Sequence, residues 1–228
     1  MIRFLDIFLS LTALILLSIP LLIVILCLLV TGEGYVFYRQ KRVGKDGKDF
    51  RLYKFATMYL DSPNIGTGTV TLKNDPRILP FGRLLRITKI NELPQLLNVI
   101  LGDMSLIGPR PLTRETFNAY KKEDQKTISS VRPGLSGIGS VYFRDEEKYI
   151  GEGEGALEKY FNFIAPKKAE LECWYVHNRS LKLYILTIFA TIISVIWRND
   201  NFLRYFYNDI PKVNMNIPSK NLKKDNIE

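Results

Sequence analysis

Two neighbouring side chains in the stretch TKINELPQ, residues 88–95, have the chemistry of an active site. Glu92 offers a carboxylate that can hold a divalent cation or move a proton. Asn91 offers a carboxamide, which is uncharged and a poor nucleophile toward phosphorus. Because His177 is the sole histidine, a Ser-His-Asp triad is disfavoured, and acid–base work falls to carboxylates, lysines or a metal. We therefore take Asn91 and Glu92 as the candidate catalytic pair.

The segment that carries this pair predicts a helix. Over residues 92–101 apolar side chains recur with helical spacing, and a proline in the first turn is compatible with a helix start. The apolar stripe consists of Leu93, Leu96, Leu97 and Ile100. Asn91 then falls at or near the N-cap, where asparagine is among the preferred residues. A capping role is the structural alternative to a catalytic one.

Two rigid segments that contain glycine and proline each carry an arginine. They are GPRP at residues 108–111, with Arg110, and RPGLSGIGS at residues 132–140, with Arg132. Backbone N–H groups and guanidinium groups in such loops can bind a pyrophosphate. Neither segment matches a P-loop or a Rossmann phosphate motif. The residues alone therefore leave phosphate binding and plain loop structure equally open.

The formal net charge of +9 predicts an acidic partner, either a phosphate-bearing substrate, anionic lipid or nucleic acid. A membrane-tethered nucleic-acid binder would fit the charge, but the sequence contains no recognised binding module. Cys27 and Cys173 lie far apart and form no C-x-x-C pair, so we expect neither a disulfide framework nor a zinc site. A reducing compartment is the simpler expectation.

Residues 7–30 form an uncharged apolar run. As a straight helix it would extend about 36 Å, against about 30 Å for a hydrocarbon core. Pro20 predicts a kink near the middle, and Ser18 is close enough to bond a carbonyl that the kink frees. Basic residues on both sides suit a re-entrant hairpin with both ends in the cytoplasm, and a single span is the alternative.

The pattern as a whole predicts an α+β, mostly helical fold, with an N-terminal membrane helix that is either re-entrant or spanning, a short β-hairpin and amphipathic helices on the membrane surface. The hairpin is expected over residues 35–40 and 50–55. Helices are expected over residues 79–90, 92–101, 113–130, 152–175 and 183–197. We expect a membrane anchor at residues 1–31, one domain of catalytic size at 32–198 and a polar tail at 199–228.

Eight short motifs follow one another along the chain in an order that is typical of one family. They are QKRVG (40–44), KFATM (54–58), DPR (75–77), FGRLLR (81–86), NELPQLLNV (91–99), GDMS (102–105), GPRP (108–111) and RPG (132–134). Together they closely resemble the bacterial sugar transferases, the monotopic phosphoglycosyl transferases that begin glycan assembly on a polyprenyl carrier. The resemblance covers residues 1–198, and so many ordered motifs argue against chance agreement.

This resemblance implies a reaction, a metal and a location. A UDP-sugar would hand its sugar-1-phosphate to polyprenyl (undecaprenyl) phosphate and release UMP, with the domain on the cytoplasmic face of the bacterial inner membrane and in contact with its lipids. Mg2+ would be held by Glu92, with Asp103 as a second candidate, and the phosphates would be bound by Lys54, Arg86, Arg110 and Arg132. We expect no nucleic-acid partner. The sequence leaves open the sugar, the polyprenol length and the formation of a homodimer.

The chain departs from the family pattern at the catalytic pair itself. Where Asn91 stands, the family has an aspartate that attacks the β-phosphate and forms a covalent phosphosugar. Three hypotheses follow. Polyprenyl phosphate attacks directly; or another carboxylate replaces the aspartate; or the chain binds a substrate or partner without turning it over. The candidate replacements are Glu92 and the acidic run Asp145, Glu146 and Glu147.

Overall fold

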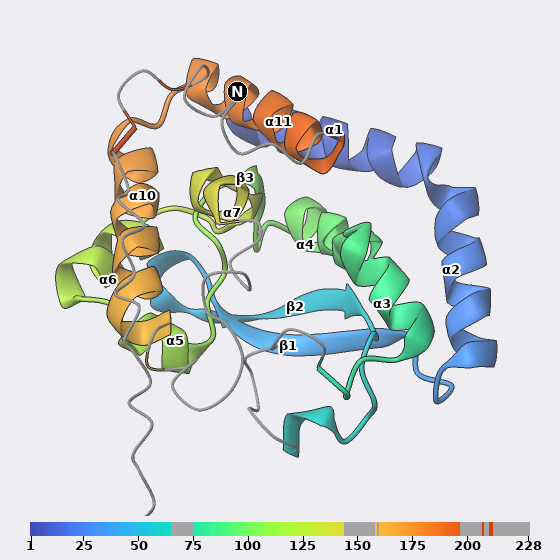
Figure 1. Cartoon of the computed structure of the whole chain (residues 1–228). Helices are drawn as coiled ribbons and strands as arrows, with labels where there is room; N and C mark the ends of the chain where they lie inside the picture. Colours follow the sequence, from blue (N-terminus) through green and yellow to red (C-terminus); the bar gives the residue numbers. More distant parts are fainter. Residues whose placement is uncertain (65–74, 144–157, 159, 197–206, 208–209, 212–228) are drawn as a thin grey trace, which may run out of the picture.

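Figure 1 shows the computed structural model of the chain, coloured from blue at the N-terminus to red at the C-terminus. The structure describes residues 1–64, 75–143, 158, 160–196, 207 and 210–211. Helices predominate among these residues, and they are accompanied by two small two-stranded sheets. The predicted α+β, mostly helical class is thereby confirmed.

The N-terminal apolar segment forms two helices that meet at a sharp bend (Figure 1). Helix α1 spans Ile2–Leu16, helix α2 spans Ser18–Thr31, and the two are bent by 64° relative to each other. Within the described residues no single helix is long and apolar enough to cross a membrane; α1 and α2 meet that requirement only as a pair. The re-entrant arrangement in a membrane stays a prediction.

The bend lies at Leu17 rather than at Pro20, which corrects the expected position of the kink. Pro20 occupies the first turn of α2, where a residue without a backbone N–H breaks no helical hydrogen bond. The hydroxyl of Ser18 donates to the carbonyl oxygen of Ile15 at 2.8 Å. The expected help from Ser18 at the break is therefore confirmed.

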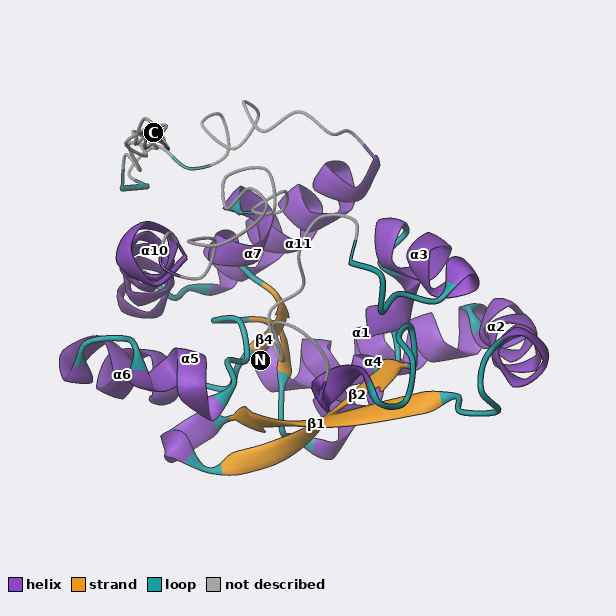
Figure 2. Ribbon diagram, turned by 60° about the horizontal axis from the view of Figure 1, so that its bottom comes forward, coloured by secondary structure: helices purple, strands orange, loops and turns teal. Residues whose placement is uncertain are grey.

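The predicted β-hairpin is present. Strand β1 (Phe37–Val43) pairs antiparallel with β2 (Asp49–Phe55), and the connecting turn η1 (Lys45–Gly47) uses left-handed backbone at Asp46 and Gly47. Figure 2 shows the hairpin, in orange, running from α5 (Arg114–Asn118) at one end toward α2 and α3 (Pro80–Ile87) at the other.

The candidate pair lies between two short helices, α3 and α4 (Gln95–Leu101). The chain reverses at Lys89, whose φ of 60° is left-handed, and closes the tight turn η3 (Ile90–Glu92) before α4 begins. The predicted helix over residues 92–101 therefore starts at Gln95, because the reversal at Lys89 uses residues 90–92 for a separate turn.

A second, parallel sheet pairs β3 (Ser105–Ile107) with β4 (Gly134–Ser136) and was not predicted, because strands of three residues show no alternation. The backbone N–H of Gly108 donates to the carbonyl oxygen of Ser136 at 2.9 Å, and that of Gly134 donates to Pro109 at 2.8 Å. These N–H groups are thus used within the loops. For Gly108 and Gly134, loop structure is supported over phosphate binding.

The C-terminal half is helical. Its elements are α5, α6 (Lys122–Ser129), α7 (Ile138–Tyr142), the π-helical turn η4 (Tyr160–Ile164), α10 (Ala165–His177) and α11 (Leu181–Ile196). The single helix expected over 113–130 is divided into two helices by a turn at residues 119–121. Tyr120 is buried in this turn, and its carbonyl oxygen accepts a hydrogen bond from the Gln125 side-chain amide at 2.7 Å. Residues 152–157 lie outside the described residues, as does the tail at 199–228 apart from Tyr207, Ile210 and Pro211.

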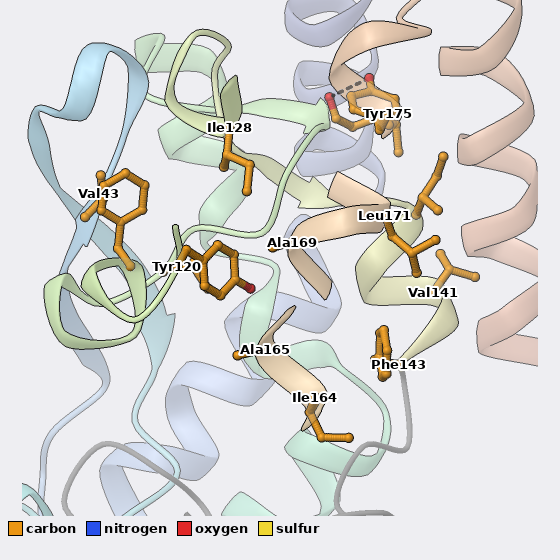
Figure 3. Packing of buried hydrophobic residues seen from close by; sticks show 14 of the residues in the cluster. Val43, Tyr120, Ile128, Val141, Phe143, Ile164, Ala165, Ala169, Leu171 and Tyr175 are labelled. Carbon is orange, nitrogen blue, oxygen red and sulfur yellow. Dashed lines mark hydrogen bonds between the residues drawn. The ribbon is translucent and has the colours of Figure 1, made fainter. Parts of the chain in front are cut away.

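The main hydrophobic core lies among α6, α7 and α10. Figure 3 shows its buried side chains, among them Ile128, Val141, Leu171 and Tyr175. A second cluster packs α2 against β2 and α3 through Leu28, Phe55 and Leu85. The bent N-terminal pair is therefore packed directly against the elements that carry the candidate site.

Asp6 fastens α1 to the rest of the protein. Its side chain is buried, and its Oδ1 accepts hydrogen bonds from the hydroxyl of Ser105 (2.9 Å), the backbone N–H of Leu106 (2.8 Å) and the hydroxyl of Tyr184 (2.7 Å). The hydroxyl of Tyr184 reaches Asp6 from α11 and so links that helix to α1. Three donors compensate for the burial of this carboxyl group.

Candidate functional site

Glu92 lies between two cations that reach it from different elements. Its Oε1 is 3.6 Å from Lys54 Nζ in β2 and 3.6 Å from a terminal guanidinium nitrogen of Arg110 in the GPRP turn that follows β3. The Glu92 and Lys54 side chains retain 16% and 19% of their exposure, and Arg110 retains 38%. Both separations exceed hydrogen-bond length, so the carboxylate is neutralised by charge without being tied to one donor.

The same geometry sets the protonation states of the pair. Burial raises the pKa of Glu92, but the charges of Lys54 and Arg110 outweigh it and hold that pKa at about 2. Burial lowers the pKa of Lys54 to about 7, with Glu92 opposing the shift and neighbouring arginines adding to it. Glu92 is therefore ionised at neutral pH, and Lys54 titrates there. An incoming anion would favour the charged form of Lys54.

Arg42 belongs to this group and was not among the predicted site residues. It donates to the carbonyl oxygen of Pro111 (3.3 Å) and to Oε1 of Gln40 (2.5 Å), while its buried Nε has no hydrogen-bond partner among the described residues. Burial and the charge of Arg110 lower the pKa of Arg42 to about 10. Such a desolvated guanidinium next to a second one favours an anion.

The hairpin register contained the signal for Arg42. Residues directly opposite each other in an antiparallel pair share a face, and Tyr38 pairs with Lys54 while Arg42 pairs with Phe50. Alternation along each strand then places Arg42 and Lys54 on one face of the hairpin. With the pairing of the two hairpin strands known, Arg42 could have been added to the site from the sequence.

Arg86 approaches the group from α3. It donates to the hydroxyl of Thr57 at 3.3 Å, and its charge is among those that lower the pKa of Lys54. The close approach of α3 depends on Gly82, because a Cβ there would lie 2.3 Å from the carbonyl oxygen of Thr57. The structure thus brings together Lys54, Arg86, Arg110 and Glu92 of the predicted set.

Asp103 and Arg132 are not brought to this group. Both lie at the opposite end of α4 from Glu92, beyond a seven-residue helix that is about 10 Å long. Asp103 Oδ2 accepts from the Asn98 side chain at 3.1 Å, and Arg132 Nε donates to the carbonyl oxygen of Gly102 at 2.7 Å. These contacts terminate α4, since Arg132 satisfies a carbonyl just past its last turn. The expected roles in metal and phosphate binding are not supported by this arrangement.

Asn91 does not cap α4, which corrects the structural alternative. Pro94 occupies the position before α4, and no side chain caps that helix. Asn91 lies instead inside the η3 turn, 6% exposed, and its Oδ1 has no hydrogen-bond partner among the described residues. An unpaired buried carboxamide oxygen has a free energy cost that a bound donor or cation would remove.

The donor chemistry of the site fits Mg2+. The described residues hold no cluster of three or more Asp, Glu, His or Cys side chains, so a protein cage for a metal is not formed by them. Mg2+ instead binds through one or two carboxylates together with water and substrate phosphates. Glu92 supplies such a carboxylate, ionised and without a hydrogen bond to a cation, and Asn91 Oδ1 is an unused oxygen beside it in sequence.

Fold and site define an α+β protein with four cations grouped around a largely buried carboxylate, and comparison with known proteins gives its family. The pattern of the family described as Bacterial sugar transferase matches residues 1–198. The chain belongs to this family.

Individual relatives agree with that assignment. The exopolysaccharide production protein PSS of Rhizobium leguminosarum bv. phaseoli is 34% identical over 212 residues, which cover 88% of this chain and 97% of the relative. The undecaprenyl-phosphate galactose phosphotransferase of Salmonella typhimurium is 34% identical over 212 residues, covering 87% of this chain and 40% of that protein. A UDP-N-acetylgalactosamine-undecaprenyl-phosphate N-acetylgalactosaminephosphotransferase of Aeromonas hydrophila is 33% identical, covering 85% and 43%.

Proposed function

We propose that the chain transfers sugar-1-phosphate from a UDP-sugar to undecaprenyl phosphate, with release of UMP, as the first membrane step of bacterial glycan assembly. The observation that carries this proposal is the placement of Glu92 between Lys54 and Arg110 at 3.6 Å each, in a chain of the bacterial sugar transferase family. The names of the relatives support the reaction class, since they include undecaprenyl-phosphate sugar phosphotransferases.

The charges of the site match the proposed substrates. The four cations Arg42, Lys54, Arg86 and Arg110 interact electrostatically with one another or with Glu92. A diphosphate and a phosphate monoester bring several negative charges into the same space, and guanidinium groups hold such oxygens in pairs. Mg2+ bound by Glu92 and the substrate would neutralise charge that develops on the phosphoryl oxygens.

The mechanism that fits Asn91 is direct transfer. An oxygen of undecaprenyl phosphate forms a bond to the β-phosphorus of the UDP-sugar, and the bond from that phosphorus to the bridging oxygen breaks, so UMP leaves with the electron pair. Arg110 and Lys54 hold the phosphoryl oxygens, and the carboxamide of Asn91 hydrogen-bonds substrate. Glu92 as a replacement nucleophile is the competing route, and the acidic run at residues 145–147 lies outside the described residues.

The lipid substrate implies a membrane face, which we assign to the apolar side chains left exposed on five helices. They include Phe4, Phe8, Leu11 and Ile15 on α1; Leu22, Ile23, Leu26 and Leu29 on α2; Leu84 and Ile87 on α3; Leu97 and Leu101 on α4; and Ile185, Phe189 and Ile192 on α11. Exposed apolar surface of this extent is typical of a membrane contact. We infer that the bent α1–α2 pair enters the cytoplasmic leaflet of the inner membrane.

A catalytically silent homologue is the second candidate, and Asn91 favours it. A chain that binds UDP-sugar or a partner protein without turnover would keep the cations while losing the nucleophile of its relatives. The two candidates differ in turnover, because direct transfer needs no carboxylate at position 91.

UMP release from a panel of UDP-sugars with Mg2+ and undecaprenyl phosphate tests the proposal on detergent-solubilised protein. We expect turnover in the parent that depends on the lipid and is lost in Glu92→Gln, while Glu170→Gln on the exposed face of α10 keeps it. Silence in the parent with every sugar, together with tight UDP binding, would instead establish the silent homologue.

A further inference from the structure

Arg110 is held at its main chain as well as at its guanidinium. Its backbone N–H donates to Oε1 of Glu172 at 3.1 Å, while its side chain reaches Glu92 at 3.6 Å. Glu172 belongs to α10 and is 4% exposed. Two carboxylates from distant parts of the chain therefore meet one arginine, Glu172 at its backbone N–H and Glu92 at its guanidinium group.

The N–H of Arg110 is an unusual donor. Pro109 and Pro111 flank it and have no backbone N–H, so Arg110 provides the single main-chain donor of these three residues. That donor goes to Glu172, whereas the Pro109 carbonyl accepts from Gly134 in the neighbouring loop. Removing the Glu172 carboxyl group would take away the acceptor of this part-buried N–H.

Two glycines leave room for the Glu172 carboxyl group and for the turn that it contacts. A Cβ at Gly139 would lie 2.4 Å from Glu172 Oε1, and a Cβ at Gly137 would lie 2.1 Å from the Gly108 carbonyl oxygen. These glycines leave the room that the Glu172 side chain and the GPRP turn occupy. Glu172 Oε2 has no hydrogen-bond partner among the described residues. Within that part of the chain, the N–H of Arg110 is therefore the hydrogen-bond donor to this carboxyl group.

We propose that Glu172 is a positioning residue of the phosphate site: by accepting the Arg110 N–H, it fixes the GPRP turn so that the guanidinium faces Glu92 and the substrate phosphates. The inference rests on the proposed function for its substrate. Glu172 is 4% exposed and accepts the main-chain N–H of Arg110, so it acts through the turn and not on substrate.

The ionisation of Glu172 supports this role. Burial raises its pKa to about 7, and the Arg110 N–H and the charges of Lys168 and Arg110 oppose that shift. The other titratable neighbours that interact with it are Cys173 and Tyr175 of the same helix. Because an ionised acceptor binds an N–H more strongly than a neutral one, the loss of the Glu172 proton near neutral pH strengthens the hold on the Arg110 turn. This effect offsets part of the phosphate affinity that the site loses when Lys54 gives up its proton in the same pH range.

A double-mutant cycle on UDP affinity, measured by calorimetry with UDP and Mg2+, tests the proposal without requiring turnover. We expect Glu172→Ala to weaken UDP binding about 10- to 100-fold, as for other groups that orient a ligand-binding side chain. In the Arg110→Ala background the same change should have little further effect, because Glu172 acts through Arg110. Glu170→Ala, exposed on the same helix, should leave affinity unchanged.

Two further variants protect the test against a folding defect. Glu172→Gln keeps the shape and an acceptor oxygen but cannot ionise, so its UDP affinity should fall more steeply than that of the parent as pH rises through 7. Gly139→Ala should reproduce the loss of affinity by displacing the Glu172 carboxyl group. Equal losses from Glu172→Ala with and without Arg110, or an unchanged pH profile in Glu172→Gln, would overturn the inference; no UDP binding by the parent would overturn the proposed function with it.

Discussion

Lys54 Nζ lies 3.6 Å from Glu92 Oε1, and both side chains are largely buried. This pair joins the β-hairpin to the turn between α3 and α4. At neutral pH the Glu92 carboxylate is ionised and Lys54 is close to its pKa of about 7, so the positive charge of the site changes with pH in this range. We propose that the phosphates of the substrates bring the negative charge that balances the remaining cations.

Phosphate affinity should fall as pH rises through about 7. The pKa of Lys54 is lowered to about 7 in the unliganded protein, so above that pH the side chain is neutral and must take up a proton to hold a phosphate. Loss of one charge-assisted contact should weaken UDP binding about tenfold between pH 6.5 and 8.5. In Lys54→Arg the side chain stays charged, so the fall in UDP affinity between pH 6.5 and 8.5 should disappear. Calorimetry across the pH range checks the result, with Lys122→Arg on the exposed surface of α6 as the control.

Glu172→Gln should stabilise the fold in alkaline but not in acidic solution. Because the pKa of Glu172 is raised from 4.5 to about 7, the folded state holds a proton that the unfolded state has lost, and parent stability falls as pH rises between those values. The shift corresponds to about 3 kcal/mol, absent in the glutamine variant. Urea unfolding in detergent at pH 5 and pH 8 measures it. An equal difference between parent and variant at both pH values would contradict the assignment.

Asp6→Ala should destabilise the protein by more than Tyr184→Phe. The alanine leaves three buried donors unpaired, at about 1–3 kcal/mol each, whereas phenylalanine removes one hydrogen bond worth about 1 kcal/mol. Thermal unfolding in detergent would order the variants, with Thr12→Ala on the exposed face of α1 as the control. Loss of Asp6 without a lower melting temperature would show that α1 is not fastened there.

Leu84→Asp should weaken membrane binding without unfolding the domain. Leu84 is 53% exposed on α3, beside the buried Leu85, so a charge there meets the proposed bilayer face and not the core. Vesicle flotation measures the effect, and Lys122→Asp on α6 serves as the matched change away from that face. Equal flotation of both variants and the parent would show that α3 does not contact the membrane.

Sequence patterns over a few residues predicted the elements whose formation depends on neighbouring residues in the chain. The hairpin and the apolar helices could be found in this way, whereas the cationic partners of Glu92, Lys54 and Arg110, were assigned through the family resemblance. The bend at Leu17 could not, because Pro20 is accommodated in a first helical turn, and neither could the parallel pairing of β3 with β4, which joins residues far apart in the chain. Asp103 and Arg132 were assigned by motif, whereas their contacts with α4 depend on how that helix ends. Glu172 carries no motif signal, and only tertiary packing brings it to Arg110.

The central claim is that a chain with Asn91 in place of a nucleophilic aspartate transfers sugar phosphate directly. Intact-protein mass spectrometry tests it, applied after incubation with Mg2+ and the UDP-sugar that supports UMP release, with and without undecaprenyl phosphate. We predict an unmodified mass for the parent under both conditions, UMP release only when the lipid is present, and a sugar-phosphate adduct in Asn91→Asp. A sugar-phosphate adduct on the parent, formed without lipid and consumed when lipid is added, would contradict it.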